Sequence, residues 1–471
     1  MTFCKYKTLH LFRRVFLLIL FFFPFQEEQV ACFAQSVYDT DLLPKEFHSG
    51  RRDALRKIMP DSSVAVFFSF PVRNRSNDID YEFHQEPNFY YLSGLREPNA
   101  VLFVFKDEYQ SNDFSVNEIL FLSDKNSQSK QWTNKRLGTW GAEKTLGIQK
   151  ALSIDTFSEI KIDFSKFKNI LLIRNDEIKE SSLYKQFKLK LSIAHTSADI
   201  YLLSEMMATL RERKTKEEIL LLRKAIESTC DALKEAMKMV EPGMYEYEIK
   251  SGIEYIFKSK GAEHSAFPSI VGGGENSCIL HYETSRKKII AKDIIVCDVG
   301  AEYHGYCADV TRTIPADGKF SEQEKILYSI VLEAQNTGIA LCKAGNDFRA
   351  PHKAAIAMLQ KRLFEVGIIK TPNEVNNFFF HGTSHYIGLD VHDVGLYGKL
   401  KPGNVITIEP GIYIPWGSDC DEKWWNIGIR IEDDILITET EPEVISSCVP
   451  KSISEIEELM KKESLFNLMK K

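Results

Sequence analysis

No two cysteines of this sequence have the Cys-X-X-Cys spacing, which argues against a structural zinc site built from paired thiolates. Dense basic clusters are also missing, and the formal net charge of −6 argues against nucleic acid as a partner. No apolar run reaches the roughly 20 residues that a membrane-spanning helix requires. With a hydrophobic content of 44%, the sequence is typical of a globular protein.

Two well-known motifs are present only in incomplete form. The triple glycine at 272–274 is followed neither by Lys-Ser/Thr nor by a helical pattern, so we reject a phosphate-binding loop. His381 and His385 have the spacing of a zinc-protease helix, but the glutamate after the first histidine is missing. Gly382-Thr-Ser384 is also a poor helix former, and this motif is therefore disfavoured.

The N-terminus has the pattern of a secretory signal. Basic residues precede the eleven-residue apolar segment 15–25, and small residues lead to a cleavage site after Ala34. We expect residues 1–34 to be removed and the protein to be secreted or periplasmic, without stable membrane association afterwards. The alternatives are a membrane anchor formed by an uncleaved N-terminus and a lipid-modified Cys32.

Cysteine usage gives no disulfide pattern. Two of the nine cysteines, Cys4 and Cys32, belong to the leader, so seven remain and at least one is unpaired in a monomer. Cys297 and Cys307 lie in apolar surroundings, where small core side chains are expected. Metal ligation by these thiols is the alternative.

The length of 471 residues indicates two or three domains. Residues 37–195 alternate short apolar strands with helical stretches, which predicts an α/β domain with its own core. The expected strands are 63–68, 100–105, 118–122 and 169–173.

From residue 196 onwards the pattern changes to long helices and a second set of strands. Thr215 and Glu218 have the spacing of a capping box, which predicts a helix from Glu217 to about Val240 that ends before Pro242-Gly243. Further helices are expected at about 245–260, 321–343 and 347–366. Periodicity alone indicates only an α+β domain.

The segment Ile294–Thr313 reads as a β-hairpin with its turn at Tyr303-His304. With that turn, Asp298 would face Asp309, and two opposed carboxylates would destabilise the sheet. A divalent cation between them removes the repulsion. The alternative is that the turn is centred elsewhere and that one aspartate is solvated or caps a turn.

Other polar residues of the C-terminal half lie in apolar segments. His381, His385 and His392 occur within twelve residues, and Glu409 lies in an apolar segment, 405–413, that is expected to be a strand. A second strand, 428–434, carries Arg430 and Glu432 on one face and isoleucines on the other. The two hairpin aspartates, Glu409, Glu432 and one or more of the histidines form an oxygen and nitrogen ligand set suited to a pair of Mn, Fe, Co or Zn ions.

In order and spacing, these motifs resemble the metal-dependent Xaa-Pro aminopeptidases (aminopeptidase P), which are related to prolidase, creatinase and methionine aminopeptidase. The N-terminal segments 83–94 and 132–138 are similar to that family as well. The resemblance implies an α/β N-terminal domain at 37–195 and an α+β pita-bread catalytic domain at 196–471. It also implies a homodimer or a homotetramer.

The resemblance implies a ligand set for two divalent ions, with Mn²⁺ expected and Zn²⁺, Co²⁺ or Fe²⁺ as alternatives. Asp298 would chelate one ion, Asp309 and Glu432 would bridge both, and His385 and Glu409 would bind the other. A hydroxide bridging the two ions would attack the peptide bond.

Five residues would act on the substrate or the transferred proton by the same resemblance. Glu409 would also shuttle the proton, His392 would polarise the scissile carbonyl, and Arg430 would orient Glu432 or the substrate. His281 and His381 would line the pocket beside proline, although by itself His281 reads more simply as a core histidine.

The expected substrates are oligopeptides with proline in second place, from which the single N-terminal residue is released. A dipeptidase of the prolidase type shares every ligand and is the alternative. A metal-free binding relative would lack at least one ligand, and all five are present.

Overall fold

A computed structural model describes residues 40–111, 113–125, 136–159 and 162–469. The predicted signal peptide, Cys32 and Trp132 lie outside these ranges. Leu43–Lys471 forms one compact unit. Among the described ranges, no helix combines the length and the apolar character that crossing a bilayer requires.

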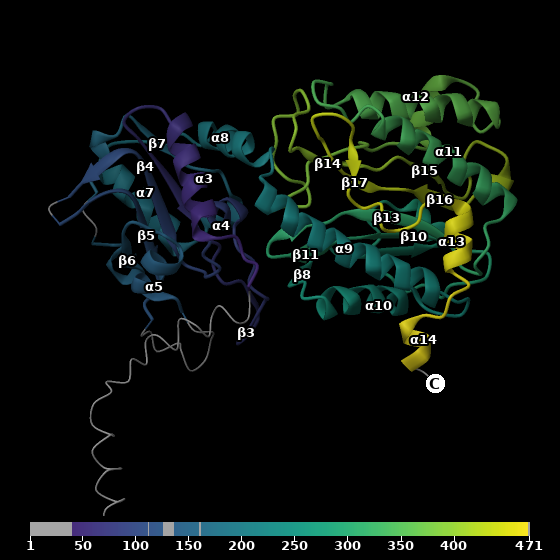
Figure 1. The fold of residues 1–471 in the computed structure, drawn as a ribbon, viewed down its shortest axis with the longest axis horizontal. Helices are drawn as coiled ribbons and strands as arrows, with labels where there is room; N and C mark the ends of the chain where they lie inside the picture. Colours follow the sequence, from purple (N-terminus) through teal and green to yellow (C-terminus); the bar gives the residue numbers. More distant parts are fainter. Residues whose placement is uncertain (1–39, 112, 126–135, 160–161, 470–471) are drawn as a thin grey trace, which may run out of the picture. The chain divides into compact units, whose positions relative to one another are not determined.

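The N-terminal part is built on a five-stranded sheet in the order β6-β5-β4-β1-β7 (Figure 1). The strands β1, β4 and β5 are antiparallel, and the short outer strands β6 and β7 are parallel to their neighbours. All four expected strands are found. The bounds are β1 Ser63–Phe68, β4 Val101–Gln110, β5 Ser115–Leu122, β6 Ala151–Ser153 and β7 Asn169–Leu171, with a separate hairpin of β2 Asn74–Ser76 and β3 Ile79–Asp80.

Both faces of this sheet are buried, because alternate side chains of each strand point to opposite sides. In β1, Ala65 and Phe67 join one core while Val64 and Val66 join the other. Helices α3, α4 and α5 contribute to the first core, and α6 and α7 contribute to the second. Their bounds are α3 Lys45–Ile58, α4 Pro87–Ser93, α5 Gly138–Thr145, α6 Asp176–Lys179 and α7 Ser182–Ile193.

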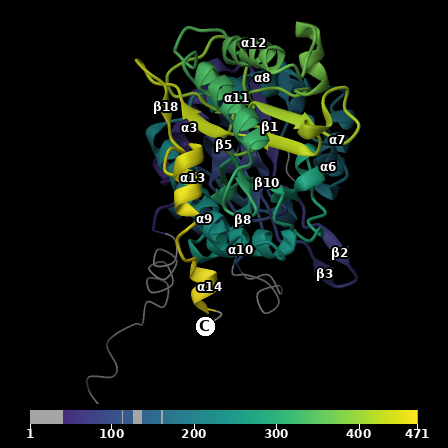
Figure 2. The same ribbon diagram turned by 90° about the vertical axis from the view of Figure 1, so that its right-hand side faces the viewer.

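The helices of the C-terminal part lie on two sides of its strands. Figure 1 shows α9 and α10 on one side of β10 and β13, and α11 and α12 on the other, and Figure 2 shows the same arrangement around β10. The capping box is confirmed, since Thr215 and Glu218 exchange hydrogen bonds at the start of α9. The bounds are α8 Leu202–Arg211, α9 Lys216–Met239, α10 Glu246–Ser259, α11 Glu322–Ile339, α12 Ala350–Glu365, α13 Ile453–Leu459 and α14 Leu465–Met469.

The strands between these helices form four small sheets. Their orders are β13-β10-β9, β12-β11-β8, β14-β17-β18 and β15-β16. The bounds are β8 His264–Ser265, β9 Ile270–Gly273, β10 Ile294–Val299, β11 Ala301–Tyr303, β12 Tyr306–Cys307, β13 Val310–Pro315, β14 Val405–Ile408, β15 Gly411–Ile414, β16 Ile427–Arg430, β17 Asp433–Leu436 and β18 Glu443–Val444.

Three extended segments leave one sheet and enter another, and each has an acidic residue between its two strands. Asp309 lies between β12 and β13, Glu409 between β14 and β15, and Glu432 between β16 and β17. The expectation of continuous strands at 405–413 and 428–434 was therefore wrong. At 409 the next residue is Pro410, which has no N–H to donate to a ladder, and the N–H of Glu409 donates to the Thr383 carbonyl.

The predicted register of the central hairpin was wrong by one residue at the turn. Tyr303 pairs with Tyr306, so His304 and Gly305 form the turn, with φ of 49° and 84°. Positive φ at both central residues is the requirement of a type I′ turn, which glycine meets without strain. Asp298 consequently pairs with Thr311 and not with Asp309.

The register change does not separate the two aspartates. Asp309 moves by two residues relative to Asp298, and a shift of two preserves the face on which a side chain lies. Glycine is required at position 300, because a Cβ atom there would lie 1.8 Å from the carbonyl oxygen of Ala308 in the other arm of the hairpin. The two carboxylates are therefore diagonal neighbours on one face of the hairpin.

Cys230 of α9 is joined to Cys448 by a disulfide that ties this helix to the segment before α13. Sequence reasoning left cysteine pairing open. Cys297 and Cys307 are free and buried, as expected for core side chains.

Candidate metal centre

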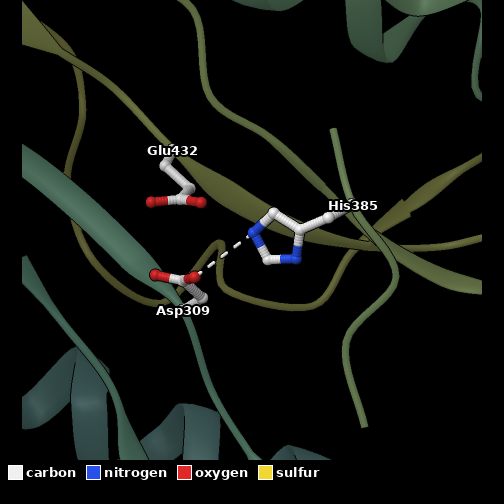
Figure 3. Close-up of side chains that lie close together, drawn as sticks. All are labelled: Asp309, His385 and Glu432. Atoms are coloured by element: carbon white, nitrogen blue, oxygen red, sulfur yellow. Dashed lines mark ion pairs between the residues drawn. The ribbon is translucent and has the colours of Figure 1, made fainter. Parts of the chain in front are cut away.

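Three side chains from separate segments converge in one buried site. Asp309, His385 and Glu432 each contribute a potential ligand atom, and these atoms lie within 4.8 Å of one another. Figure 3 shows the three side chains pointing toward a common space. His385 Nε2 lies 3.4 Å from Asp309 Oδ2.

The remaining two expected ligands adjoin this cluster. Glu409 Oε1 lies 3.6 Å from His385 Nε2. Asp298 Oδ2 accepts a hydrogen bond from Arg430 at 2.7 Å. The other carboxylate oxygens of Asp298 and Asp309, both Oδ1, are buried without a hydrogen-bond partner.

Burial and mutual repulsion disfavour ionisation of these carboxylates. Burial, followed by the charges of neighbouring carboxylates, raises the pKa of Asp309 and of Glu432 well above the usual range. Burial raises the pKa of Glu409 to about 7, although His385 and Arg430 oppose the shift. Arg430 is the arginine beside these four carboxylates, so negative charge exceeds positive charge when the carboxylates are ionised.

The residues fit a pair of divalent cations. Buried carboxylate oxygens without partners are costly unless something compensates them, and a cation would do so. Four carboxylates and one imidazole are also the donor types that Mn²⁺ and similar ions prefer. Metal binding would return the carboxylates to their ionised form.

The three other histidines lie around the cluster. His381 Nδ1 is 3.6 Å from Glu409 Oε2, and its Nε2 is 2.8 Å from the Tyr413 hydroxyl. The ring of His392 lies 4.4 Å from that of His385. His281 lies on an exposed turn, so the interpretation of His281 as a core histidine was wrong. Burial, followed by the charges of His385 and His281, lowers the pKa of His392.

Arg430 is buried and is held by several partners. It donates to Asp298, to the Tyr413 hydroxyl at 2.9 Å and to the Leu280 carbonyl. The carboxylate that it orients directly is thus that of Asp298, while Glu432 accepts from the Thr311 hydroxyl at 2.7 Å.

Sequence reasoning gave no role to Tyr413, Thr311 or Asp434. Asp434 accepts a hydrogen bond from the Asp309 N–H at 3.2 Å and fixes the backbone at that ligand. Burial raises the pKa of Asp434 to about 8. The run of three acidic residues from Glu432 to Asp434, flanked by isoleucines, was the available signal.

Two family models match this chain. Residues 221–439 match the model described as metallopeptidase family M24, and residues 48–170 match the aminopeptidase P N-terminal domain. The boundary expected at 195–196 falls between the matched segments and stays a prediction.

Known relatives match over most of their length. Xaa-Pro aminopeptidase of Escherichia coli is 37% identical over 431 residues, which cover 87% of this chain and 96% of the relative. The structure of E. coli aminopeptidase P with the inhibitor Pro-Leu has a TM-score of 0.82, at 33% identity, and covers 89% of this chain and 99% of that one. Pseudomonas aeruginosa aminopeptidase PepP has a TM-score of 0.83 at 30% identity, with coverage of 89% and 99%.

Proposed function

The chain belongs to the Xaa-Pro aminopeptidases of metallopeptidase family M24, and we propose that it removes the N-terminal residue from oligopeptides whose second residue is proline. Membership confirms the predicted hydrolase class and the predicted fold, an N-terminal domain followed by a pita-bread catalytic domain. The observation that carries the proposal is the convergence of Asp309, His385 and Glu432.

The proposed ligands are those expected from the motifs. Asp298 and Asp309 would hold one ion, His385 and Glu409 the other, and Asp309 with Glu432 would contact both. We propose Mn²⁺ as the metal. Two divalent ions supply chemistry that the side chains lack, because they lower the pKa of water enough to give hydroxide near neutral pH.

Glu409 is the proposed carrier of the proton that leaves the attacking water. A general base must lie within reach of the proton that it abstracts, and Glu409 Oε1 lies 3.6 Å from Nε2 of the proposed metal ligand His385. His381 adjoins the same carboxylate at 3.6 Å. His392 would donate to the scissile carbonyl, and His281 with His381 would flank the proline ring.

Specificity for proline has a chemical basis. An X-Pro bond has no N–H, so peptidases that require this donor handle it poorly. The E. coli relative was solved with Pro-Leu, a dipeptide that begins with proline. Such a molecule has the form of the product that remains after removal of the N-terminal residue.

Peptide hydrolysis tests the proposal. Arg-Pro-Pro should release arginine, whereas Arg-Ala-Pro should be cleaved at least about tenfold more slowly, a difference worth about 1.4 kcal/mol. Product release is followed by mass spectrometry with a dipeptide, Arg-Pro, in parallel. Cleavage of the dipeptide alone would assign the prolidase reaction instead, and cleavage of neither would refute both.

Metal removal gives a second test. We expect EDTA to abolish hydrolysis and Mn²⁺ to restore it best among Mn²⁺, Zn²⁺, Co²⁺ and Fe²⁺, because oxygen-rich sites suit Mn²⁺. The rate after dialysis against each ion is the measurement. Full activity in EDTA, with metal analysis showing an empty protein, would contradict the metal assignment.

We further propose that the mature enzyme is secreted or periplasmic and assembles as a homodimer or homotetramer. The signal-like N-terminal sequence supports the first point, and family resemblance supports the second.

A further inference from the structure

A pocket of about 210 Å³ lies directly beside the candidate metal centre. His392, whose ring is 4.4 Å from that of His385, forms part of its lining. Cys307, two residues before Asp309, forms another part, and the Cys307 N–H donates to the Gly388 carbonyl at 2.8 Å. The pocket therefore borders the candidate metal centre on the side of His392.

The lining combines an apolar wall with acidic groups. Ala266, Leu389 and Val391 provide the apolar surface, and Glu302 and Asp390 provide the carboxylates. Long basic side chains have the matching form, since their methylene stems lie on apolar surfaces while their charged heads seek carboxylates.

The two carboxylates differ in how their charge is balanced. Asp390 accepts from Arg211 at 2.8 Å, and Arg211 is shared with Asp393, which also binds Lys214 at 2.9 Å. Two cations thus face two carboxylates in that group.

Glu302 is balanced differently, by a histidine, His84, which also lines the pocket. The Glu302 side chain is only 7% exposed, and its Oε2 lies 3.1 Å from His84 Nε2. Within the described ranges, no lysine or arginine forms an ion pair with Glu302. The hydrogen bond to Glu302 raises the pKa of His84, so Glu302 already stabilises a neighbouring cation.

We propose that this pocket receives the side chain of the substrate's N-terminal residue and selects arginine or lysine, with Glu302 as the specificity-determining residue. The inference rests on the proposed aminopeptidase function, which supplies the N-terminal residue to be recognised. Arginine can donate two parallel hydrogen bonds to a carboxylate, whereas an acidic side chain would be repelled by Glu302.

Three tripeptides test the wild-type enzyme. Arg-Pro-Pro is compared with citrulline-Pro-Pro, which has nearly the same shape without the charge, and with Glu-Pro-Pro. We expect kcat/KM for the arginine peptide to exceed that for the citrulline peptide about tenfold, the value of one hydrogen bond to a charged group. The glutamate peptide should be slowest. Equal rates for arginine and citrulline would overturn the inference while leaving the aminopeptidase function intact.

A matched pair of variants tests whether Glu302 determines the specificity. In Glu302→Gln the ratio of kcat/KM between the arginine and citrulline peptides should fall to near one. Glu322→Gln, at a glutamate that is 81% exposed on α11, should keep the wild-type ratio. Persistence of the ratio in Glu302→Gln would refute the role of Glu302. If Glu302→Gln does not fold, the comparison of the three peptides with the wild-type enzyme still tests whether the pocket selects a positively charged side chain. Failure of the wild type to cleave any of the three peptides would refute the proposed function itself.

Discussion

Replacement of Asp309 by alanine is expected to lower kcat/KM for Arg-Pro-Pro by about a thousandfold or more. Asp309 lies in the group of three ligand atoms and is the proposed bridge between both ions. Its removal would therefore weaken two metal sites together, and with them the source of the nucleophile. The metal content of the purified variant, measured by mass spectrometry, should fall with the activity.

The fold should survive this substitution. Burial and repulsion raise the pKa of Asp309 in the metal-free protein, so removing the carboxylate relieves repulsion instead of breaking a stabilising contact. We expect the melting temperature of metal-free Asp309→Ala to equal or exceed that of the metal-free wild type. Added Mn²⁺ should stabilise only the wild type, because a ligand stabilises the state that binds it.

Asp317→Ala is the control, because Asp317 is an exposed aspartate in the turn after the same hairpin. It should leave activity and metal content unchanged. If Asp309→Ala retained two ions or a tenth of the wild-type rate, the assignment of Asp309 as a bridge would be wrong.

Replacement of Arg312 by methionine is expected to destabilise the protein by about 3–5 kcal/mol, as breaking a buried ion pair does. Arg312 is fully buried in β13. It donates to the Asp433 carboxylate at 2.8 Å and to the carbonyls of Glu432 and Pro450. Methionine has a similar length but leaves these acceptors without a donor.

The loss of stability is large because Arg312→Met would remove a cation from the buried carboxylate of Asp433. The charges of Arg312 and Lys451 lower the pKa of this fully buried carboxylate to about 2, against the opposing effect of burial. Without Arg312, Asp433 would keep only one of its two cations. The backbone of the neighbouring ligand Glu432 would also lose a hydrogen bond from Arg312 of 2.6 Å.

Urea denaturation of metal-free protein measures this effect without the contribution of bound ions. Arg349→Met, at an exposed arginine next to α12, is the matched control and should change the free energy of unfolding by less than about 0.5 kcal/mol. The double variant Arg312→Met/Asp433→Asn should lose less than the sum of the single losses. A loss below about 1 kcal/mol in Arg312→Met would show that the pair is not structural.

Sequence reasoning recovered the elements whose determinants are local. The helix that begins after Thr215 was found because its cap and its stop signal lie next to it in the chain. The strand at 63–68 was found because a continuous apolar run bounded by polar residues indicates a buried strand. Both predictions needed no information from distant residues.

The hairpin shows where local reasoning stops. Two positions for the turn, one residue apart, were compatible with the glycines at 300 and 305. The observed choice depends on the close approach of Gly300 to Ala308 and on positive φ at His304 and Gly305. The conclusion that Asp298 and Asp309 share a face survived because it depends on the parity of the register, not on its value.

By itself, the sequence determined which residue types could bind metal, the periodicity of the long elements and the family. Only the tertiary structure decided that strands end at Asp309, Glu409 and Glu432, that Arg430 holds Asp298, and that Asp434 supports the Asp309 backbone. The reason is the separation along the chain. Arg430 and Asp298 are 132 residues apart, and contacts over such distances depend on how sheets pack, which no local pattern encodes.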